Sequence, residues 1–260
     1  MAATPLLFPD ATAVARAAAQ TFLDLSLAAT AAHHTFRVAL SGGSTPKRLY
    51  SVLAEEPFRS RMPWSKIHFF VSDERNVPPD HPESNFGAAK HGLFSKVSVP
   101  AANIHRVLTE RPPVEAAALY QNAIAASFGG NPEQPPCFDL IFLGMGADGH
   151  TASLFPETSA LAESERWVAS NWVEKLQCHR FTFTYPLINR AAHVLILVTG
   201  EDKAERIASI FGPDAQPGVY PVQHVRPVEG TLNWYLDKVA AARTPGLSSA
   251  KPAEPAAAAS

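Results

Sequence analysis

Short apolar segments alternate along the chain with longer segments whose apolar residues recur at helical spacing. The apolar segments have strand length and lie at residues 36–40, 67–71, 138–143, 180–185 and 193–198. Helical spacing marks residues 10–29, 46–55, 85–94, 114–128, 201–211 and 231–242. Strands that alternate with helices in this way are joined by crossover connections, which make the strands parallel. The sequence therefore predicts an α/β fold with a mainly parallel sheet and helices on both faces.

One domain accounts for most of the chain. The 260 residues suffice for one large α/β domain or two small ones, and they contain no internal repeat. We expect a single domain over residues 1–243. Residues 244–260 consist largely of Ala, Pro and Ser, and this composition predicts a disordered tail. Near the start of the domain, Thr45 is expected to cap a helix whose first residue is Pro46.

Composition excludes several classes of function. Apolar residues make up 46% and charged residues 18% of the chain, which is typical of a soluble globular enzyme. The net charge of −2 provides no basic field for nucleic acid, and no apolar run reaches membrane-spanning length. The N-terminus lacks the basic and apolar regions of a secretory signal. Two cysteines, Cys137 and Cys178, form neither a disulfide framework nor a zinc site. We expect a cytoplasmic monomer.

The segment from Gly144 to Pro156 carries the strongest chemical signal. It follows a buried apolar run, and its glycines allow a tight turn that holds Asp148 and His150 two residues apart. Gly144, Gly146 and Gly149 also match the dinucleotide pattern G-x-G-x-x-G. Asp148 would then lie beside an anionic pyrophosphate, and the motif lies in the middle of the chain, so we disfavour that interpretation. A purely structural turn is the second alternative, and an active site is the favoured one.

Four of the predicted strands end in polar turns. These turns lie at residues 41–46, 72–76, 144–156 and 199–203. In open α/β sheets, ligands bind outside the carboxyl ends of the strands. The four turns are therefore expected to surround one crevice.

The first of these turns has the composition of an anion site. Gly42 and Gly43 free backbone N–H groups to point inward, and Ser44 and Thr45 add hydroxyl groups. A helix that begins near Pro46 presents its positive end to the same place. The spacing is not that of a P-loop, so a phosphate monoester is favoured over a nucleotide. A simple helix-capping turn is the alternative.

Charged residues in the other turns are candidates for binding the same anion. Arg75 is suited to clamp a phosphate, while Asp73 is suited to orient a sugar hydroxyl or to hold Arg75. Glu74 is expected on a solvated face. Lys203 lies near a helix start, where the dipole disfavours a cation, and this position suggests an anionic ligand. Arg180 is a weaker candidate for the same role.

Together these motifs carry a family resemblance. The strings at residues 41–46, 72–75, 84–85 and 144–156 resemble those of the 6-phosphogluconolactonases, in the glucosamine-6-phosphate isomerase/6-phosphogluconolactonase family. The closing segment, residues 230–241, is similar to that family's C-terminal helix. The resemblance covers nearly the whole chain except the tail. It implies a Rossmann-like three-layer fold, related to glucosamine-6-phosphate deaminase, and hydrolysis of 6-phospho-D-glucono-1,5-lactone to 6-phosphogluconate in the oxidative pentose phosphate pathway. It implies no metal and no organic cofactor.

The residues are suited to this reaction. Opening a lactone needs a water, a base and stabilisation of an oxyanion. A histidine, with an ordinary pKa of about 6.5, can accept a proton from water at neutral pH, so His150 is the candidate base. Asp148 is then suited to orient the imidazole or to hold substrate, and strand-end amides or a nearby cation to receive the oxyanion. No G-x-S-x-G elbow supports a serine nucleophile.

Two alternatives remain open. Glucosamine-6-phosphate deaminases resemble the chain in the 41–46 and 148–150 strings, but they typically have Phe-Asn-Glu-Pro where this chain has Ser153-Leu154-Phe155-Pro156. They also carry Asp-Glu-Tyr in place of Asp73-Glu74-Arg75. Both differences favour the lactonase. A sugar-phosphate sensor attached to a DNA-binding helix-turn-helix is the other alternative, and no basic recognition helix is present to support it.

Overall fold

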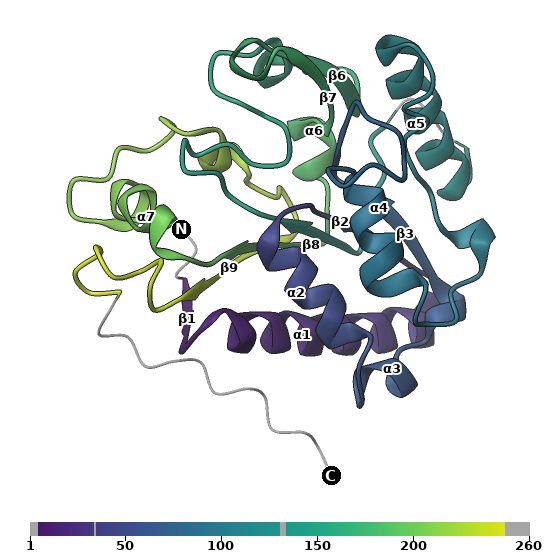
Figure 1. Ribbon diagram of the computed structural model, residues 1–260, viewed down its shortest axis with the longest axis horizontal. Helices are drawn as coiled ribbons and strands as arrows, with labels where there is room; N and C mark the ends of the chain where they lie inside the picture. The colour runs from purple at the N-terminus through teal and green to yellow at the C-terminus, as the bar shows by residue number, and fades with distance from the viewer. Residues whose placement is uncertain (1–4, 34, 131–133, 248–260) are drawn as a thin grey trace.

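A six-stranded parallel sheet forms the centre of the molecule in the computed structural model, which describes residues 5–33, 35–130 and 134–247 (Figure 1). The strand order is β1-β9-β8-β5-β2-β3, and every neighbouring pair is parallel. The strands are β1 (Leu6–Phe8), β2 (Phe36–Leu40), β3 (Ile67–Val71), β5 (Leu140–Leu143), β8 (His193–Val198) and β9 (Thr231–Asp237). The predicted fold class is therefore confirmed.

Helices cover both faces of this sheet. The longer helices are α1 (Ala11–His33), α2 (Ser44–Leu53), α5 (Pro113–Ser127) and α7 (Ala204–Phe211). Shorter helical segments are α3 (Phe58–Arg61), α4 (Asn85–Ala89), a π-helical turn (Lys90–Phe94) and α6 (Tyr185–Ile188). In Figure 1, α1 runs below the sheet and α5 lies above it.

Successive strand residues point into two separate cores, because side chains alternate across a sheet. On β5, Phe142 packs in the core that includes residues of α1 and α2, while Ile141 and Leu143 pack in the core that includes residues of α5 and α7. On β8, Leu195 and Val194 divide in the same way. Burial on both faces explains why the central strands are continuous apolar runs.

A second, three-stranded antiparallel sheet lies beside the first. It consists of β4 (Asp73–Arg75), β7 (Cys178–Phe183) and β6 (Val168–Val173), in that order. A short helical turn, Glu174–Leu176, joins β6 to β7 as a hairpin. Of these strands the sequence predicted only β7, placed at residues 180–185. This sheet is important for the site because β4 directly continues the turn after β3.

The predicted helix at residues 231–242 is wrong in its first half. Residues Thr231–Asp237 form β9, which pairs with β8 on one side and with β1 on the other. Trp234 and Leu236 face one core while Tyr235 faces the other, so both sides of the segment are buried. The apolar spacing is compatible with a helix, but the open strand position between β1 and β8 decides the conformation.

Smaller predictions at the helix ends also need correction. Gly43, and not Thr45, is the cap of α2, and the helix begins at Ser44. The segment at residues 201–211 begins as a short 3₁₀ turn and becomes α-helical only at Ala204. Thr244 is buried and Leu247 packs against the core, so the expected disorder is wrong for residues 244–247. The rest of the expected tail, 248–260, lies outside the described residues.

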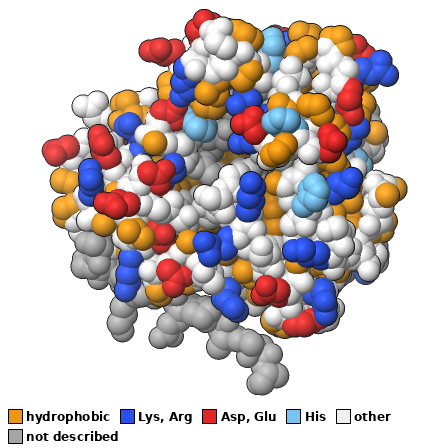
Figure 2. Space-filling model, in the orientation of Figure 1, with side chains coloured by type: hydrophobic (Ala, Val, Ile, Leu, Met, Phe, Trp, Pro, Cys, Tyr) orange, Lys and Arg blue, Asp and Glu red, His pale blue; other side chains and the backbone are white. Residues whose placement is uncertain are grey.

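No helix in the described ranges has both the length and the apolar character needed to cross a membrane. Acidic and basic side chains are interspersed over the face shown in Figure 2.

Candidate active site

A cavity of about 470 Å³ opens at the carboxyl edge of the parallel sheet. It is lined by residues from the turns that follow β2, β3, β5 and β8, together with the β6–β7 hairpin. Among the residues that line it are Gly42, Gly43, Ser44, Thr45, Asp73, Arg75, His150, Arg180 and Lys203. The structure thus brings together nearly all of the residues that the sequence singled out; Asp148 lies beside the cavity, behind His150.

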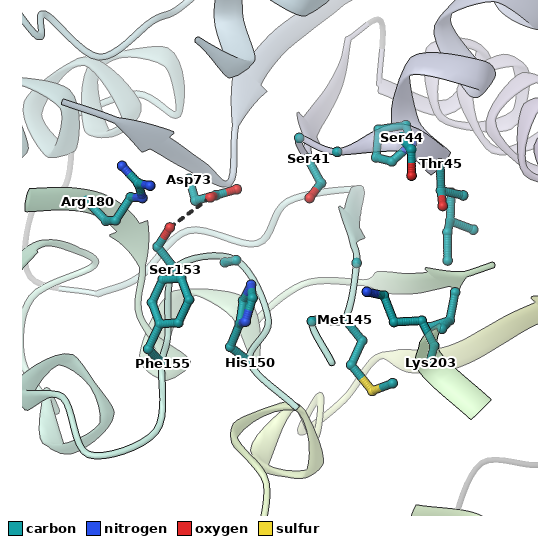
Figure 3. Close-up of a pocket in the computed structure, with 18 of the residues that line it drawn as sticks. Ser41, Ser44, Thr45, Asp73, Met145, His150, Ser153, Phe155, Arg180 and Lys203 are labelled. Carbon is teal, nitrogen blue, oxygen red and sulfur yellow. Dashed lines mark hydrogen bonds between the residues drawn. The ribbon is translucent and has the colours of Figure 1, made fainter. Parts of the chain in front are cut away.

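His150 is held by Asp148. Its ring Nδ1 lies 2.5 Å from Asp148 Oδ1, and its backbone N–H donates to the same oxygen at 3.2 Å. A carboxylate at Nδ1 selects the tautomer with the proton there, so Nε2 keeps its lone pair. Figure 3 shows the ring directed into the cavity, with Arg180, Asp73 and Ser153 on one side and Thr45 and Lys203 on the other. The other ring nitrogen, Nε2, makes no hydrogen bond with the described residues and is therefore available to a ligand.

Asp148 also contacts a residue that sequence reasoning missed. Lys175, in the tip of the β6–β7 hairpin, contacts the other carboxylate oxygen, Oδ2. Burial of the Asp148 carboxyl opposes its ionisation, but hydrogen bonds from His150 and Lys175 outweigh this effect and hold its pKa well below the usual range. Asp148 is therefore a carboxylate throughout the physiological pH range.

Two glycines shape the turn around His150. A Cβ on Gly146 would lie 2.1 Å from the ring atoms Cε1 and Nδ1 of His150. Gly149 has φ +81°, and a Cβ there would lie 2.7 Å from Tyr220. Only glycine permits both the left-handed backbone and this close approach. Two of the three glycines in the pattern that resembles a dinucleotide fingerprint, Gly146 and Gly149, are thus required to seat His150 against Asp148.

The turn after β2 brings backbone close to the cavity. Gly43 has φ +104°, and a Cβ on Gly42 would lie 1.8 Å from Asn85 Oδ1. The N-terminus of α2 has no side-chain cap, so its first N–H groups remain directed toward this side of the cavity. Thr45 Oγ1 lies 2.7 Å from Thr199 Oγ1, which ties the turn after β2 to the turn after β8. This arrangement is that of an anion site.

Four cationic side chains line the cavity, and Lys175 is the one that pairs with Asp148; the others are Arg75, Arg180 and Lys203. Arg75 and Arg180 are opposite each other in the β4–β7 register, and like charges in such a pair repel. The Arg75 side chain donates to the Glu83 carbonyl at 2.5 Å, whereas the Arg180 guanidinium has no hydrogen-bond or ion-pair partner among the described residues. Lys203 contacts Asp202 at 2.5 Å, so part of its unfavourable position near a helix start is offset by that carboxylate. The two arginines are the less compensated charges.

The prediction of a solvated Glu74 is wrong. Glu74 is only 2% exposed, and its carboxylate accepts hydrogen bonds from the backbone N–H groups of Arg75, Asn85 and Phe86 and from the Ser84 hydroxyl. Burial raises the pKa of this carboxyl, and the four hydrogen bonds act in the opposite direction. Glu74 therefore fastens the N-terminus of α4 to β4, which a charge run in the sequence does not reveal.

Asp73, the first residue of β4, connects the second sheet to the turn that carries His150. Its Oδ2 accepts from the Ser153 hydroxyl at 2.8 Å, and its backbone carbonyl accepts from the Asn85 amide at 2.8 Å. No ion pair joins Asp73 to Arg75 in the described part of the chain, so the proposed role of holding Arg75 is not supported by a contact. Ser153 and Asn85 belong to the motifs at residues 144–156 and 84–85, yet their roles depend on contacts with Asp73, which is distant in the sequence.

The described residues contain no group of three or more histidine, cysteine, aspartate or glutamate side chains arranged to hold a metal ion. Cys137 and Cys178 are free thiols.

Comparisons with known proteins agree with this architecture. A 6-phosphogluconolactonase from Nostoc sp. is 40% identical over 243 residues, which cover 93% of this chain and 98% of that protein. The structure of a 6-phosphogluconolactonase from Trypanosoma cruzi has a TM-score of 0.82 at 29% identity and covers 93% of this chain and 97% of that one. The fold is also shared with a monomeric glucosamine-6-phosphate deaminase, at a TM-score of 0.75 and 17% identity over 92% of this chain and 99% of that one.

The sequence model described as glucosamine-6-phosphate isomerases/6-phosphogluconolactonase matches residues 9–234, which include every strand that contributes to the cavity. With the Nostoc relative, this match covers most of the chain. The chain belongs to the glucosamine-6-phosphate isomerase/6-phosphogluconolactonase family.

Proposed function

We propose that the chain hydrolyses 6-phospho-D-glucono-1,5-lactone to 6-phosphogluconate, with His150 as the general base. The observation that carries this proposal is the pair of His150 and Asp148 at the cavity wall, with Nδ1 engaged and Nε2 free. Water held at Nε2 gives its proton to the imidazole while its oxygen attacks C1 of the lactone. This step converts the C1 carbonyl into a tetrahedral oxyanion.

Collapse of this intermediate completes the reaction. The C1–O5 bond breaks, and the ring oxygen takes the proton that His150 acquired from water. The product acid then ionises, so each turnover releases one proton at neutral pH. Asp148 is proposed to orient the imidazole and to stabilise its protonated form, as carboxylates do in comparable pairs. Arg180, which has no anionic partner within the described ranges, is the proposed cation for the oxyanion.

The phosphate is assigned to the part of the cavity formed by the turn after β2. Gly43, Ser44 and Arg75 line a side recess that adjoins the cavity, and Lys203 lines the cavity itself. Backbone N–H groups at the start of α2 and two cations form a site for a doubly charged phosphate. We propose that Gly42, Gly43, Ser44 and Thr45 bind it with Arg75 and Lys203. Asp73 is proposed to accept a hydrogen bond from a sugar hydroxyl.

We further propose a single functional domain that acts as a cytoplasmic monomer with no metal and no organic cofactor. All residues assigned to the reaction lie on one chain. The free thiols of Cys137 and Cys178 suit a reducing compartment. Light scattering of the purified chain tests the monomer.

The test of function is proton release from freshly generated lactone, corrected for spontaneous hydrolysis and run beside ammonia release from glucosamine 6-phosphate. We expect lactone opening and no ammonia. His150→Ala should lower kcat about 100-fold or more, as loss of a general base does. The matched control is His193→Ala, because His193 lies at the opposite end of β8 from the cavity. Wild-type turnover in His150→Ala would refute the assignment of the base. Ammonia release would show that the chain is a glucosamine-6-phosphate deaminase and would refute the proposed reaction.

A further inference from the structure

Lys175 completes a group of three residues around the proposed base. Its Nζ contacts Asp148 Oδ2, while His150 occupies Oδ1, so the carboxylate lies between a permanent cation and the imidazole. The same Nζ lies 4.8 Å from the centroid of the Phe155 ring, and that ring lies 4.1 Å from the His150 ring. Lys175 thus contacts both side chains that surround His150.

The position of Lys175 in the fold is as specific as its contacts. It belongs to the Glu174–Leu176 turn at the tip of the β6–β7 hairpin, where the following residue, Gln177, adopts a left-handed conformation with φ +49°. Both Lys175 and Leu176 line the cavity. The contact with Asp148 therefore connects the hairpin tip to the turn that holds the base.

We propose that Lys175 is a positioning residue for the reaction, which fastens the hairpin tip to Asp148 and limits the negative charge that His150 experiences. The inference rests on the proposed role of His150. It concerns a residue that acts through Asp148 and not one that touches the substrate.

The physical reason is the effect of Asp148 on the proton affinity of the imidazole. A carboxylate next to a histidine favours its protonated form, and a fully protonated base cannot accept a proton from water. A cation on the far oxygen of the carboxylate reduces this effect. Loss of the Lys175 charge would therefore leave the full effect of Asp148 on the imidazole. The pair is partly exposed, with side-chain exposures of 52% for Lys175 and 31% for Asp148, so the expected shift is modest.

Other charged groups lie near Asp148 and His150, and they are the same in the wild type and in a Lys175 variant. Those that line the cavity or contact the same turn are Asp73, Arg75, Arg180, Asp202, Lys203 and Arg206. None of them contacts Asp148. Replacement of Lys175 therefore changes the charge next to Asp148 and leaves the other charged residues of the cavity in place.

The experiment measures kcat and KM of Lys175→Met between pH 5.5 and 8, because methionine keeps an unbranched apolar side chain and removes the charge. The acid limb of the kcat profile should move up by about 0.5 to 1 pH unit. At pH values below the limb, this shift lowers kcat about 3- to 10-fold, while kcat at pH 8 stays close to wild type. Lys175→Arg should restore the wild-type limb. Lys96→Met, an exposed lysine that does not line the cavity, is the control.

A second readout does not depend on turnover. Nuclear magnetic resonance titration of the His150 ring, without substrate, should give a midpoint that is higher in Lys175→Met than in the wild type by the same interval. An unmoved acid limb together with an unmoved ring titration would refute the proposal, as would a rise in KM alone at every pH, which would make Lys175 a substrate ligand. If the proposed role of His150 is wrong, the His150→Ala variant remains active, and this result is distinct from either outcome for Lys175→Met.

Discussion

Replacement of Glu74 by glutamine tests whether this residue is a structural anchor. The carboxylate is 2% exposed and accepts four hydrogen bonds. Oε1 accepts from the N–H groups of Arg75 and Asn85, both at 2.7 Å. Oε2 accepts from the Ser84 hydroxyl at 3.0 Å and from the Phe86 N–H at 2.8 Å.

The geometry determines the cost of the substitution. A glutamine amide has only one oxygen, which is best placed at Oε1, where it retains both backbone donors. Its NH₂ group then faces Ser84 and Phe86. The Ser84 hydroxyl can turn to accept, but the Phe86 N–H remains unsatisfied, at a cost of about 1–3 kcal/mol. The two retained bonds also lose their charge assistance, about 1 kcal/mol each. We expect a loss of about 3–5 kcal/mol in the free energy of unfolding.

Urea denaturation followed by tryptophan fluorescence measures this quantity for the wild type and for Glu74→Gln. The matched control is Glu55→Gln, because Glu55 is exposed and its side chain makes no hydrogen bond in the described part of the chain. That variant should change the unfolding free energy by less than about 0.5 kcal/mol. An equally small change in Glu74→Gln would refute the assignment, since it is the behaviour of a solvated carboxylate.

Three further predictions concern the site and the stability of the fold. Gly146→Ala places a methyl 2.1 Å from the His150 ring and should lower kcat about 100-fold, whereas Gly144→Ala, whose methyl meets nothing closer than 4.0 Å, should lose less than about tenfold in the same assay. Lys203→Ala should raise KM about 10- to 100-fold, the equivalent of a charged hydrogen bond, and weaken inhibition by inorganic phosphate; an unchanged KM would remove Lys203 from the phosphate site. Burial, followed by nearby positive charges, lowers the pKa of His105 to about 4, so the unfolded chain binds the additional proton and stability is lost as pH falls from about 6.5 to 4. The free energy of unfolding is measured by denaturation at pH 7 and at pH 4.5. Because His105 is only half buried, we expect the decrease between these two pH values to be about 1–2 kcal/mol smaller in His105→Gln than in the wild type.

Four of the six strands in the parallel sheet, and the arrangement of the site at their carboxyl ends, were predictable from the sequence. Three predicted strands, 36–40, 67–71 and 193–198, have the same bounds in the structure. Parallel strands that are buried on both faces need continuous apolar runs, and such runs are a local property of the sequence. Because parallel strands have their carboxyl ends at one edge, the turns that follow them were bound to meet, and most of the predicted site residues line the same cavity.

Features that depend on a distant partner were not predictable. Residues 231–237 became a strand because β1 and β8 leave an open position between them, although their apolar spacing also suits a helix. Glu74 lies in a charge run that is typical of a solvated surface, and only the return of residues 84–86 to β4 buries it. Lys175 is 27 residues from Asp148, and its role depends on where the β6–β7 hairpin ends.

The sequence by itself thus determined the parallel sheet, the edge at which the site forms and the pair of His150 and Asp148, since each depends on residues close together in the chain or on the direction that parallel strands share. The tertiary structure alone decided which charges are buried, which are paired and which segment forms the strand between β1 and β8. Those outcomes are set by contacts between residues far apart in the chain, and local patterns of hydrophobicity carry no information about them.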